Sequence, residues 1–553
     1  MTKKRTASDF LALLSQIVVE EPNDQGGVSN EPDVIVEDEE EVYSNLPNIN
    51  FSGSPINFND WFNAENHDFN APKPEPVIYQ HEQKIVLSTS STIPKEKPLL
   101  FNSLQPNSNE EFFKNDFIPS LFDYRDFFYI GDDFENYRHP SVLHVINHIY
   151  SDLYIKKHRP RDDVRDTTYT MTTVLVICPT RYQAYQFIND IIHFLPKTTE
   201  DGTPFEIQNL DRLQNEYTIE ELPQFIQRTK PKDWLRTFGG NNSNEFKMGI
   251  RFHEHKIELF HQMSRSQLVI ASSLSLFLHD DMDFMSSIEV LILDSLDVLL
   301  MQNSDRLLQL ISMLNKLPQK VTETDWKHLR LYCTDKQQHK MRQNIIYSSV
   351  LTPEIHNMFS RFENIRGQIL IRPKKYPPLL LPGLERNFKR LSCANIKNIG
   401  DTIERCFREK IFFLIKQWRS EPEEVAKRTI VYFVSTYRFL QARKMLEDNM
   451  IGFLELSDES TDEDNKRMKR AFRDDKNAVM LMTERFYFHY RPKLRQIERV
   501  VFIQPPTFQQ FVGELAGNCT ATFYFTEFDE GALERVVGSD VYGKILQSEF
   551  YTI

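Results

Sequence analysis

The sequence predicts an α/β protein in which two parallel-sheet domains follow one another along the chain. Short apolar runs such as Val174–Cys178 and Val290–Leu293 end in polar residues, as fully buried strands do. Segments with helical periodicity alternate with these runs, and this alternation is typical of a parallel sheet. A proline-rich stretch at Arg372–Pro382 divides the pattern into two series, which indicates two domains joined by a linker.

The first series predicts a domain over residues 118–372. Its predicted strands are Val174–Cys178, Leu268–Ala271, Val290–Leu293 and Asn344–Tyr347. The predicted helices around them are Ser141–Tyr154, Ala184–Phe194, Leu274–Leu278 and Arg306–Leu317. Because ligands of open α/β sheets bind beyond the carboxyl ends of the strands, the polar residues that end these runs are the candidate site residues.

The second series predicts a domain over residues 373–553. Its predicted strands are Thr429–Val434, Phe453–Leu456, Ala478–Met482, Val500–Ile503 and Thr520–Phe525. Its predicted helices are Thr402–Trp418, Arg438–Asp448 and Asp462–Asp474. The two domains share no repeated sequence, so what repeats is the architecture.

Residues 1–117 are predicted to form a mostly disordered acidic tail. They hold 8 lysines and arginines against 20 aspartates and glutamates, a net charge of −12, whereas the rest of the chain carries −1. Such a composition buries too little apolar surface to offset chain entropy. The tail is either a solvating segment or an arm that folds onto partners through aromatics such as Trp61 and Phe62. Within it, residues 10–19 predict a short amphipathic helix rather than a signal peptide.

The composition, with 40% hydrophobic and 26% charged residues, is that of a soluble globular protein. Five widely spaced cysteines without a CxxC pair argue against a disulfide framework and a zinc site. No apolar run reaches the roughly 18 residues that a membrane-spanning helix needs. His144 and His148 lie four residues apart on a predicted helix, but with no third ligand we expect a structural role and no metal site.

Polar residues at four predicted strand ends stand in the order of the motifs of superfamily-two helicases, whose cores are two RecA-like domains. Pro179, Thr180 and Arg181 match the PTR of an RNA-contacting motif. Ser272 stands at a T-P-G turn, Asp294 and Asp297 delimit the D-E-A-D position, and Ser348 begins the S-A-T position. The order and spacing of the four matches predict a degenerate, RecA-like helicase core.

The groups that hydrolyse ATP in such a core are missing. A P-loop needs Gly-x-x-x-x-Gly-Lys-Ser/Thr, and the sequence contains no such match. Ser295 stands where the helicases have the glutamate that activates water, and a neutral hydroxyl cannot replace that carboxylate. After Val500–Ile503 the chain lacks the arginine motif that stabilises the transition state. We therefore expect no ATPase activity and no cofactor.

The segment Thr483–Arg499 mixes aromatic and basic side chains and is a candidate RNA or partner surface. Basic residues can follow a phosphate backbone while aromatic rings stack on bases. The alternative is that the aromatics pack in the core and the basic residues solvate a turn. The candidate contact residues are Arg485, Tyr487, His489, Arg491, Lys493 and Arg495.

Together these stretches resemble the U3 small-nucleolar-RNA-associated protein 25 family, whose core is DEAD-box-like and degenerate. The resemblance is most specific at FMSSIEVLILDSLDVLLMQN, residues 284–303, and at TERFYFHYRPKLRQIERVVF, residues 483–502. Further similar stretches are LHVINHIY, VLVICPTR, GGNNSNEFKMGI, SQLVIASSLSL and YSSVLTPEIHNMF. This sequence differs from the family pattern at Ser295-Leu296 and at Ser273, which marks a divergent member.

The resemblance implies a nucleolar, hence nuclear, factor of the small-subunit processome. Such a factor would act with U3 snoRNA and other processome proteins on the pre-rRNA that yields 18S rRNA. Our first hypothesis is a non-catalytic scaffold that binds pre-rRNA and proteins through both domains and the tail, without a membrane partner. The alternatives are an ATP-dependent RNA helicase with a noncanonical site and a scaffold that binds proteins only.

Overall fold

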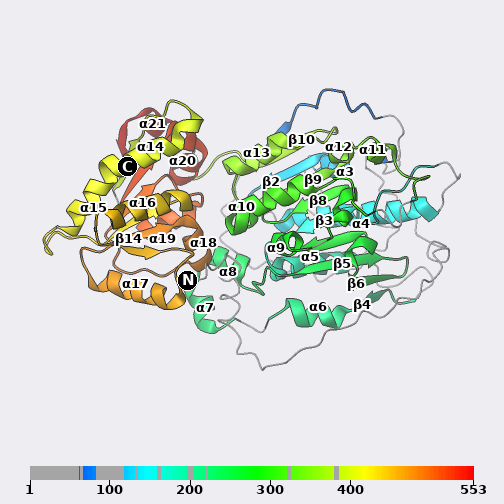
Figure 1. The fold of residues 1–553 in the computed structure, drawn as a ribbon, viewed down its shortest axis with the longest axis horizontal. Helices are drawn as coiled ribbons and strands as arrows, with labels where there is room; N and C mark the ends of the chain where they lie inside the picture. The colour runs from blue at the N-terminus through cyan, green and yellow to red at the C-terminus, as the bar shows by residue number, and fades with distance from the viewer. Residues whose placement is uncertain are drawn as a thin grey trace.

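The computed structural model describes residues 61–62, 67–81, 118–132, 135–157, 164–195, 203–219, 222–279, 281–320, 325–378 and 385–553. The helix predicted in residues 10–19 and the acidic cluster at 37–41 lie outside these ranges. Within them, the chain forms two sheets that lie side by side, each in its own domain (Figure 1). The prediction of two tandem α/β domains built on parallel sheets is confirmed.

The sheet of the first domain has the strand order β1-β10-β2-β9-β8-β3-β7-β5-β6-β4. Its strands are parallel, except that β5 runs antiparallel to both of its neighbours, β6 and β7. The strands are β1 Val77–His81, β2 Asp126–Ile130, β3 Val174–Ile177, β4 Glu206–Gln208, β5 Lys247–Phe252, β6 Lys256–His261, β7 Leu268–Ala271, β8 Val290–Leu293, β9 Gln343–Ser348 and β10 Gln368–Pro373.

Helices pack on both faces of this sheet. The helices are α3 Ile118–Phe122, α4 Glu135–Lys157, α5 Arg181–Phe194, α6 Leu210–Tyr217, α7 Gln224–Thr229, α8 Lys232–Phe238, α9 Ser273–Phe277, α10 Leu296–Met313, α11 Leu331–Thr334, α12 Gln338–Met341 and α13 Pro353–Arg361. Two 3₁₀ turns are η4 Met263–Arg265 and η5 Asp283–Ser287.

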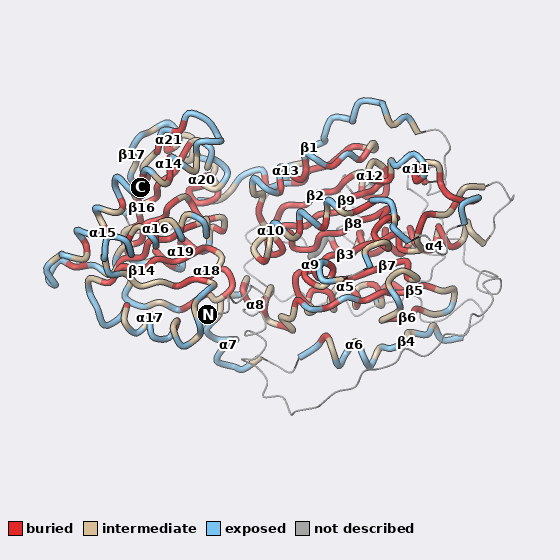
Figure 2. The backbone as a smooth tube through the Cα atoms, in the orientation of Figure 1, coloured by how far each residue is buried: buried red, intermediate tan, exposed pale blue. Residues whose placement is uncertain are grey.

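Strand β3 shows why its sequence is apolar at every position. Val174 and Val176 join the core cluster on one face of the sheet, whereas Leu175 and Ile177 join the cluster on the other face. Because alternate side chains of a strand point to opposite faces, a strand covered on both faces needs an unbroken apolar run. Figure 2 shows the central strands of both sheets as buried backbone, with exposed segments on outer helices such as α6.

The sheet of the second domain has the strand order β13-β14-β12-β15-β16-β11-β17. Its strands are parallel except for β17, which runs antiparallel to β11. The strands are β11 Arg386–Arg390, β12 Thr429–Phe433, β13 Leu454–Leu456, β14 Val479–Thr483, β15 Arg499–Ile503, β16 Thr520–Phe525 and β17 Phe550–Thr552. The helices are α14 Ile399–Cys406, α15 Phe412–Arg419, α16 Thr436–Asp448, α17 Asp462–Asp474, α18 Glu484–Tyr490, α19 Gln509–Ala516, α20 Glu530–Val537 and α21 Tyr542–Gln547.

Shorter helical pieces complete this domain. The π-helix Phe407–Ile411 joins α14 to α15, so the single helix predicted at Thr402–Trp418 contains a local widening. The 3₁₀ turns are η6 Ile396–Asn398 and η8 Glu527–Asp529. The predicted boundary at residues 372–373 falls at the end of β10, and β11 starts the second sheet at Arg386.

The first domain also uses part of the chain that the sequence assigned to the disordered tail. Strand β1 pairs in parallel with β10 at the edge of the first sheet. Trp61 and Phe62 are buried in the first domain, where the Phe62 ring meets Tyr124 edge-on at 5.0 Å. The guanidinium of Arg366 lies 5.2 Å from the centre of the Trp61 ring. Composition did not reveal this segment because its contacts are made by isolated aromatics inside a polar stretch.

We predict that Phe62→Ala lowers the free energy of unfolding of the first domain by about 3 kcal/mol, because it empties a buried aromatic site. Urea denaturation of the full chain measures this change. Phe225→Ala is the matched control, since Phe225 is 67% exposed and its truncation should shift the midpoint little. Equal midpoints for the two variants would show that the Trp61–Phe62 segment adds no stability.

Candidate functional site

The chain that follows β2, described at Gly131 and Asp132, stands where a phosphate-binding loop would lie. A P-loop connects a strand to the following helix. Strand β2 is separated from the acid-ended strand β8 only by β9, and α4 follows it directly. The loop reads Gly-Asp-Asp-Phe, and the Gly131 amide donates to the Ser348 carbonyl at 2.9 Å. In sequence this stretch has two aspartates and no Gly-Lys pair, and carboxylates repel phosphate rather than cradling it.

The carboxylate at the end of β8 pairs with an arginine of α4. Asp294 is buried, and its Oδ2 lies 3.4 Å from Nη2 of Arg138. Arg138 is itself buried, and its Nη1 lies 3.9 Å from Oδ2 of Asp190 on α5. His139 places Nε2 3.5 Å from the other oxygen of Asp190. The cation that faces Asp294 is therefore a protein side chain on the helix that follows the phosphate-loop position.

The second carboxylate, Asp297, lies in the first turn of α10. It is buried, and it accepts a hydrogen bond from the Ser349 hydroxyl. Burial raises the pKa of the Asp297 carboxyl, while the Ser349 hydrogen bond opposes that shift. Ser295 precedes α10 with a left-handed φ of +56°, and it receives a hydrogen bond from Gln183 at 3.5 Å. These contacts connect the two carboxylate positions to β9 and α5 within the first domain.

The predicted residues Thr180 and Ser272 cap helices that begin at strand ends. The Thr180 hydroxyl accepts from the Gln183 amide at the start of α5, and Ser272 accepts from the Ser275 amide at the start of α9. The Pro179 carbonyl accepts from the Gln302 side chain at 2.8 Å. The Ser348 hydroxyl donates to the Val350 carbonyl at 2.7 Å. In this structure the four strand ends make local contacts within the protein.

Arg181 also makes its contacts inside the first domain. Its guanidinium donates to the carbonyls of Glu216 and Glu245, at 3.1 and 2.8 Å. It also lies 5.7 Å from the centre of the Tyr217 ring. These interactions fix the side chain between α5, α6 and the chain that leads into β5.

The segment predicted as an RNA or partner surface begins as helix α18, which faces the first domain. The Thr483 hydroxyl caps this helix by accepting from the Phe486 amide. Arg491 follows the helix with a φ of +38°, and its guanidinium pairs with Asp233 of α8 and with Glu514 of α19. It also lies 4.1 Å from the centre of the Phe511 ring. The buried Arg491 thus joins elements of both domains through two partly exposed carboxylates.

Helices α7 and α8 lie between the two domains (Figure 1). Trp234 of α8 donates from its indole nitrogen to the His489 carbonyl at 2.7 Å. Its ring and that of Phe238 belong to the core cluster of the second domain. On the other side of α8, Arg236 donates to the Asp132 carbonyl at 2.7 Å. Helix α8 therefore connects the phosphate-loop position of the first domain to the core of the second.

A break in α10 supplies a further contact between the domains. Asn303 has non-helical angles of −165° and 97°, which interrupt the helix. Carbonyl groups before such a break lose their partners within the helix. Arg485 donates to the Gln302 carbonyl at 2.6 Å, and Nε2 of His489 lies 3.4 Å from the Met301 carbonyl. Two residues of α18 thus satisfy backbone groups that the kink leaves open.

The six candidate contact residues therefore divide into two groups. Tyr487, His489 and Arg491 are buried, and Arg485 is half-buried at the interface between the domains. Burial lowers the pKa of His489 to about 3, so its ring is neutral at pH 7. Only the two remaining candidates, Lys493 and Arg495, are exposed. These two keep the side-chain access that an RNA or partner contact requires.

His144 and His148 belong to a buried polar cluster at the amino ends of β8 and β9. The candidate site residues lie at the carboxyl ends of the strands. Nε2 of His144 lies 2.7 Å from the Gln343 side-chain oxygen, and His148 Nε2 lies 3.1 Å from a Glu289 oxygen. Glu289 also pairs with the buried Arg330. Among the described residues, no group of three or more His, Cys, Asp or Glu is placed to hold a metal ion. The same part of the chain contains no helix that is both long and apolar enough to cross a membrane.

The sequence did not single out Arg138, Asp233, Trp234, Arg236 and Glu514. Arg138 carried a signal, because it lies near the start of α4, the helix that follows β2 at the nucleotide position. The α8 residues carried none, since they lie in a polar stretch between two predicted strands. Asp233 and Trp234 precede their partners on the second domain by 258 and 255 residues. Glu514 lies in QPPTFQQFVGELAG, for which the only prediction was that the arginine motif is missing.

Residues 124–369 match the family model "UTP25, NTP hydrolase-like domain", and residues 379–553 match "Utp25, C-terminal domain". The chain belongs to the UTP25 family. The two matches are separated by residues 370–378, which overlap the linker predicted from the sequence. The description of the first domain agrees with the RecA-like fold predicted there.

Relatives of the family cover most of the chain. The U3 small nucleolar RNA-associated protein 25 of Schizosaccharomyces pombe is 28% identical over 454 residues, covering 76% of this chain and 67% of that protein. Protein NUCLEOLAR FACTOR 1 of Arabidopsis thaliana is 27% identical over 561 residues, covering 91% of this chain and 71% of that protein. The human homolog of protein 25 is 27% identical, covering 77% of this chain and 60% of that protein.

Similar solved structures include DEAD-box proteins at low identity. The yeast splicing factor Prp28 is 12% identical, covers 78% of this chain and 82% of its own, and has a TM-score of 0.28. A DEAD box protein from Methanococcus jannaschii is 12% identical, covers 78% and 89%, and has a TM-score of 0.21. The fold of this family member is therefore assigned from its strand order and the family models.

We predict that Arg491→Gln destabilises the contact between the domains by about 3 kcal/mol, because it leaves Asp233 and Glu514 without their cation. Both carboxylates are less than one-third exposed, at 31% and 26%, so solvent offsets part of the loss. The denaturation midpoint and the radius of gyration from X-ray scattering measure the effect. Arg495→Gln, at an exposed position, is the control. The assignment fails if both variants behave alike.

We also predict a pH-dependent gain in stability from Glu484→Gln. Glu484 is fully buried at the start of α18, and burial raises its pKa from 4.5 to about 7. The folded state then holds this proton more tightly than the unfolded chain, so stability falls as pH rises through the interval from 4.5 to 7. The glutamine stays neutral. Its advantage should be small at pH 5 and reach up to about 3 kcal/mol at pH 8, measured by urea denaturation. A pH-independent difference would contradict this account.

Proposed function

We propose that this protein is a non-catalytic, helicase-like assembly factor of the nucleolar small-subunit processome. In this role it associates with U3 snoRNA and supports the processing of pre-rRNA toward 18S rRNA. The observation that carries the proposal is the match of both domains to the UTP25 family, whose relatives are named for association with U3 small nucleolar RNA. The location that follows is the nucleolus, within the nucleus.

The absence of catalysis is supported by the electrostatics of the nucleotide position. Phosphoryl transfer needs positive groups around the phosphates and a carboxylate free to hold magnesium. Here the loop is acidic, Arg138 faces Asp294, and the Ser349 hydroxyl donates to Asp297. Arg236 further contacts Asp132 from α8. Each change removes a separate requirement of the reaction, so one compensating residue would not restore it.

The contact between the domains supports a scaffold role. A helicase cycle requires its two domains to close and open around ATP and RNA. In this protein, α8 packs in the core of the second domain, and Arg491 pairs with Asp233. Arg535 of α20 adds a contact by donating to the Leu351 carbonyl at 2.9 Å. We infer that the two domains present one fixed surface to pre-rRNA and to other processome proteins, with no cofactor.

We predict that the tagged protein, purified from cells, recovers U3 snoRNA, pre-rRNA and processome proteins, and that recovery persists in Asp294→Asn, which removes the charge while keeping a hydrogen-bond acceptor for Arg138. RNA sequencing and mass spectrometry of the eluate measure this. Purified protein should hydrolyse radiolabelled ATP at the rate of a no-enzyme blank, with or without RNA. RNA-stimulated hydrolysis that Asp294→Asn abolishes would establish the noncanonical helicase instead. An eluate with processome proteins but no crosslinked RNA would establish the scaffold that binds proteins only.

A further inference from the structure

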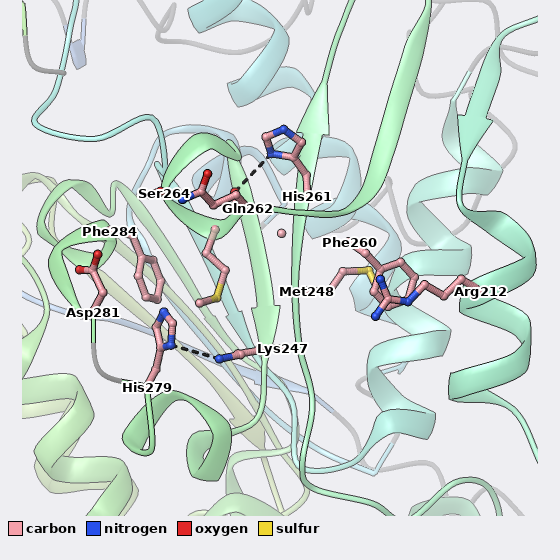
Figure 3. Close-up of a pocket in the computed structure, with 12 residues that line it drawn as sticks. Arg212, Lys247, Met248, Phe260, His261, Gln262, Ser264, His279, Asp281 and Phe284 are labelled. Atoms are coloured by element: carbon pink, nitrogen blue, oxygen red, sulfur yellow. Dashed lines mark hydrogen bonds between the residues drawn. The ribbon is translucent and has the colours of Figure 1, made fainter. Parts of the chain in front are cut away.

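The cations that an anionic partner can contact are those that no other side chain of the protein already holds. In the cavity of about 430 Å³ beside the hairpin β5–β6, Arg212 pairs with Glu216 (Figure 3). At another wall of this cavity, Lys247 donates to Nδ1 of His279 at 3.1 Å. The situation differs on the second domain, along α17 and the chain that follows α18. There, the following side chains have no ion-pair partner among the described residues: Lys466, Lys469, Arg470, Lys493 and Arg495.

The middle of α17 carries cations without carboxylates. Between Asp464 and Asp474 the sequence reads NKRMKRAFR, with five lysines and arginines and no acidic residue. Asp464 pairs with Arg467 at 3.2 Å, and Asp474 pairs with Arg473 at 3.0 Å. The two ends of the helix therefore neutralise two of the five cations.

The remaining cations of α17 lie away from the core. Met468 and Phe472, four residues apart, pack in the core of the second domain. Lys466 and Arg470, also four residues apart, are exposed. Residues with this spacing are neighbours on a helix surface, so the two cations form one row on the solvent side of α17.

The chain after α18 is held against both ends of α17. At the start of this chain, burial and the nearby Asp462 carboxylate of α17 raise the pKa of Tyr490. At its end, Glu498 pairs with Arg428 at 3.1 Å, and Nε of Arg428 donates to the Arg473 carbonyl at 3.2 Å. Residues 490–498 therefore run beside α17 from its first turn to its last.

Side chains of residues 490–498 divide between the core and solvent. Leu494 and Ile497 pack against the core of the second domain. Lys493 and Arg495, on either side of Leu494, are exposed. A second row of cations thus lies beside the row on α17.

The first domain adds a lysine at one end of these rows. Lys230, which follows α7, donates to the Tyr490 carbonyl, and α7 lies next to α17 (Figure 1). Burial and the nearby Lys469 charge lower the pKa of Lys230 to about 8. Burial and the Lys466 charge also lower the pKa of Lys469, while Asp462 opposes that shift. Like charges held this close repel one another, so a bound anion stabilises this end of the surface.

We call this surface the basic ridge, and its residues are Lys230, Lys466, Lys469, Arg470, Lys493 and Arg495. Its composition favours a nucleic-acid backbone over a protein partner. Protein interfaces are centred on apolar and aromatic anchors and are poor in lysine. Large apolar side chains are exposed elsewhere on the second domain, but α17 and residues 490–498, all of which the structure describes, contribute none. Lysine and arginine contact phosphates without such anchors, and those contacts carry no sequence information.

We propose that the basic ridge binds the phosphate backbone of RNA without selecting its sequence. The ridge is separate from the helicase-motif positions, which are strand ends of the first domain. The assignment to RNA rests on the proposed function, since positive charge by itself attracts any polyanion.

Fluorescence anisotropy of the full chain with fluorescein-labelled oligouridine and oligoadenosine of equal length tests the ridge. We expect the two strands to bind within 2-fold of each other, with an affinity that falls steeply as KCl rises. The double variant Lys466→Ala with Arg470→Ala should weaken both at least 10-fold. It should also flatten the slope of log affinity against log salt by about 1.4, since each phosphate contact on a single strand contributes about 0.7.

The matched control is Arg405→Ala with Lys416→Ala. These exposed cations lie on α14 and α15, which cover the other face of the second sheet. The control should bind like wild type, and both double variants should keep the wild-type urea midpoint. Equal binding by the two double variants, no binding by wild type, or a 10-fold preference for one sequence overturns the proposal.

Crosslinking in cells distinguishes RNA from an acidic protein partner. Under the proposal, Lys466→Ala with Arg470→Ala loses at least 5-fold of the crosslinked RNA and keeps its processome proteins. A variant that keeps the RNA and loses those proteins would assign the ridge to a protein and overturn the proposal.

The failure of the ridge and the failure of the proposed function have different signatures. Should the ridge variant bind oligouridine like wild type while U3 snoRNA still co-purifies, the ridge assignment fails and the proposed function stands. Loss of oligouridine binding in the variant, with no U3 snoRNA recovered by the wild-type protein, upholds the ridge and removes the proposed function.

Discussion

The arrangement of the two domains depends on the burial of Arg491 between Asp233 and Glu514. Two carboxylates from different domains share one guanidinium, and that guanidinium also lies over the Phe511 ring. Taking charges out of water is costly, so such a pair persists only when geometry and further hydrogen bonds are good. With α8 in this position, Trp234 packs in the core of the second domain. Arg485 of α18 donates to the Gln302 carbonyl at the break in α10. The Arg491 ion pairs thus lie beside the other contacts that join the two domains, those of Trp234, Arg485 and Arg535.

The nucleotide position keeps the strands of a phosphate-binding fold, while its side chains serve stability. Strand β8 still delivers Asp294 to the carboxyl edge of the sheet, but Arg138 now meets the carboxylate. The Ser349 hydroxyl likewise donates a hydrogen bond to the Asp297 carboxylate. A buried carboxylate needs a partner whether or not it performs chemistry, because an unpaired charge in the interior is strongly destabilising. The motif positions therefore serve as internal contacts of the first domain.

The sequence predicted best where burial is complete on both sides. Strands β7 and β8 match their predicted ranges residue for residue, because a short unbroken apolar run is typical of a strand that is covered on both faces. The sequence did not predict strands β5 and β6, because charged residues interrupt their apolar residues and a bulge interrupts their pairing. In Thr483–Arg499 the mixture of rings and cations was recognised, but composition cannot tell whether an arginine meets a phosphate or a carboxylate. The partners of Arg491 are the carboxylates of Asp233 and Glu514. Only the tertiary fold brings these residues to the arginine.

The placement of β1 has a consequence for the order of events during synthesis. This strand, near residue 77, pairs with β10, near residue 369, which is the last strand of its sheet to leave the ribosome. Closing a loop of that size precedes any gain from the pairing, and such non-local contacts form late. The N-terminal strand must therefore wait, unpaired, while the rest of the first domain is added. The sequence of residues 1–117 carries a net charge of −12, and charge of one sign on a chain disfavours the pairing of an unpaired strand with other copies of that chain.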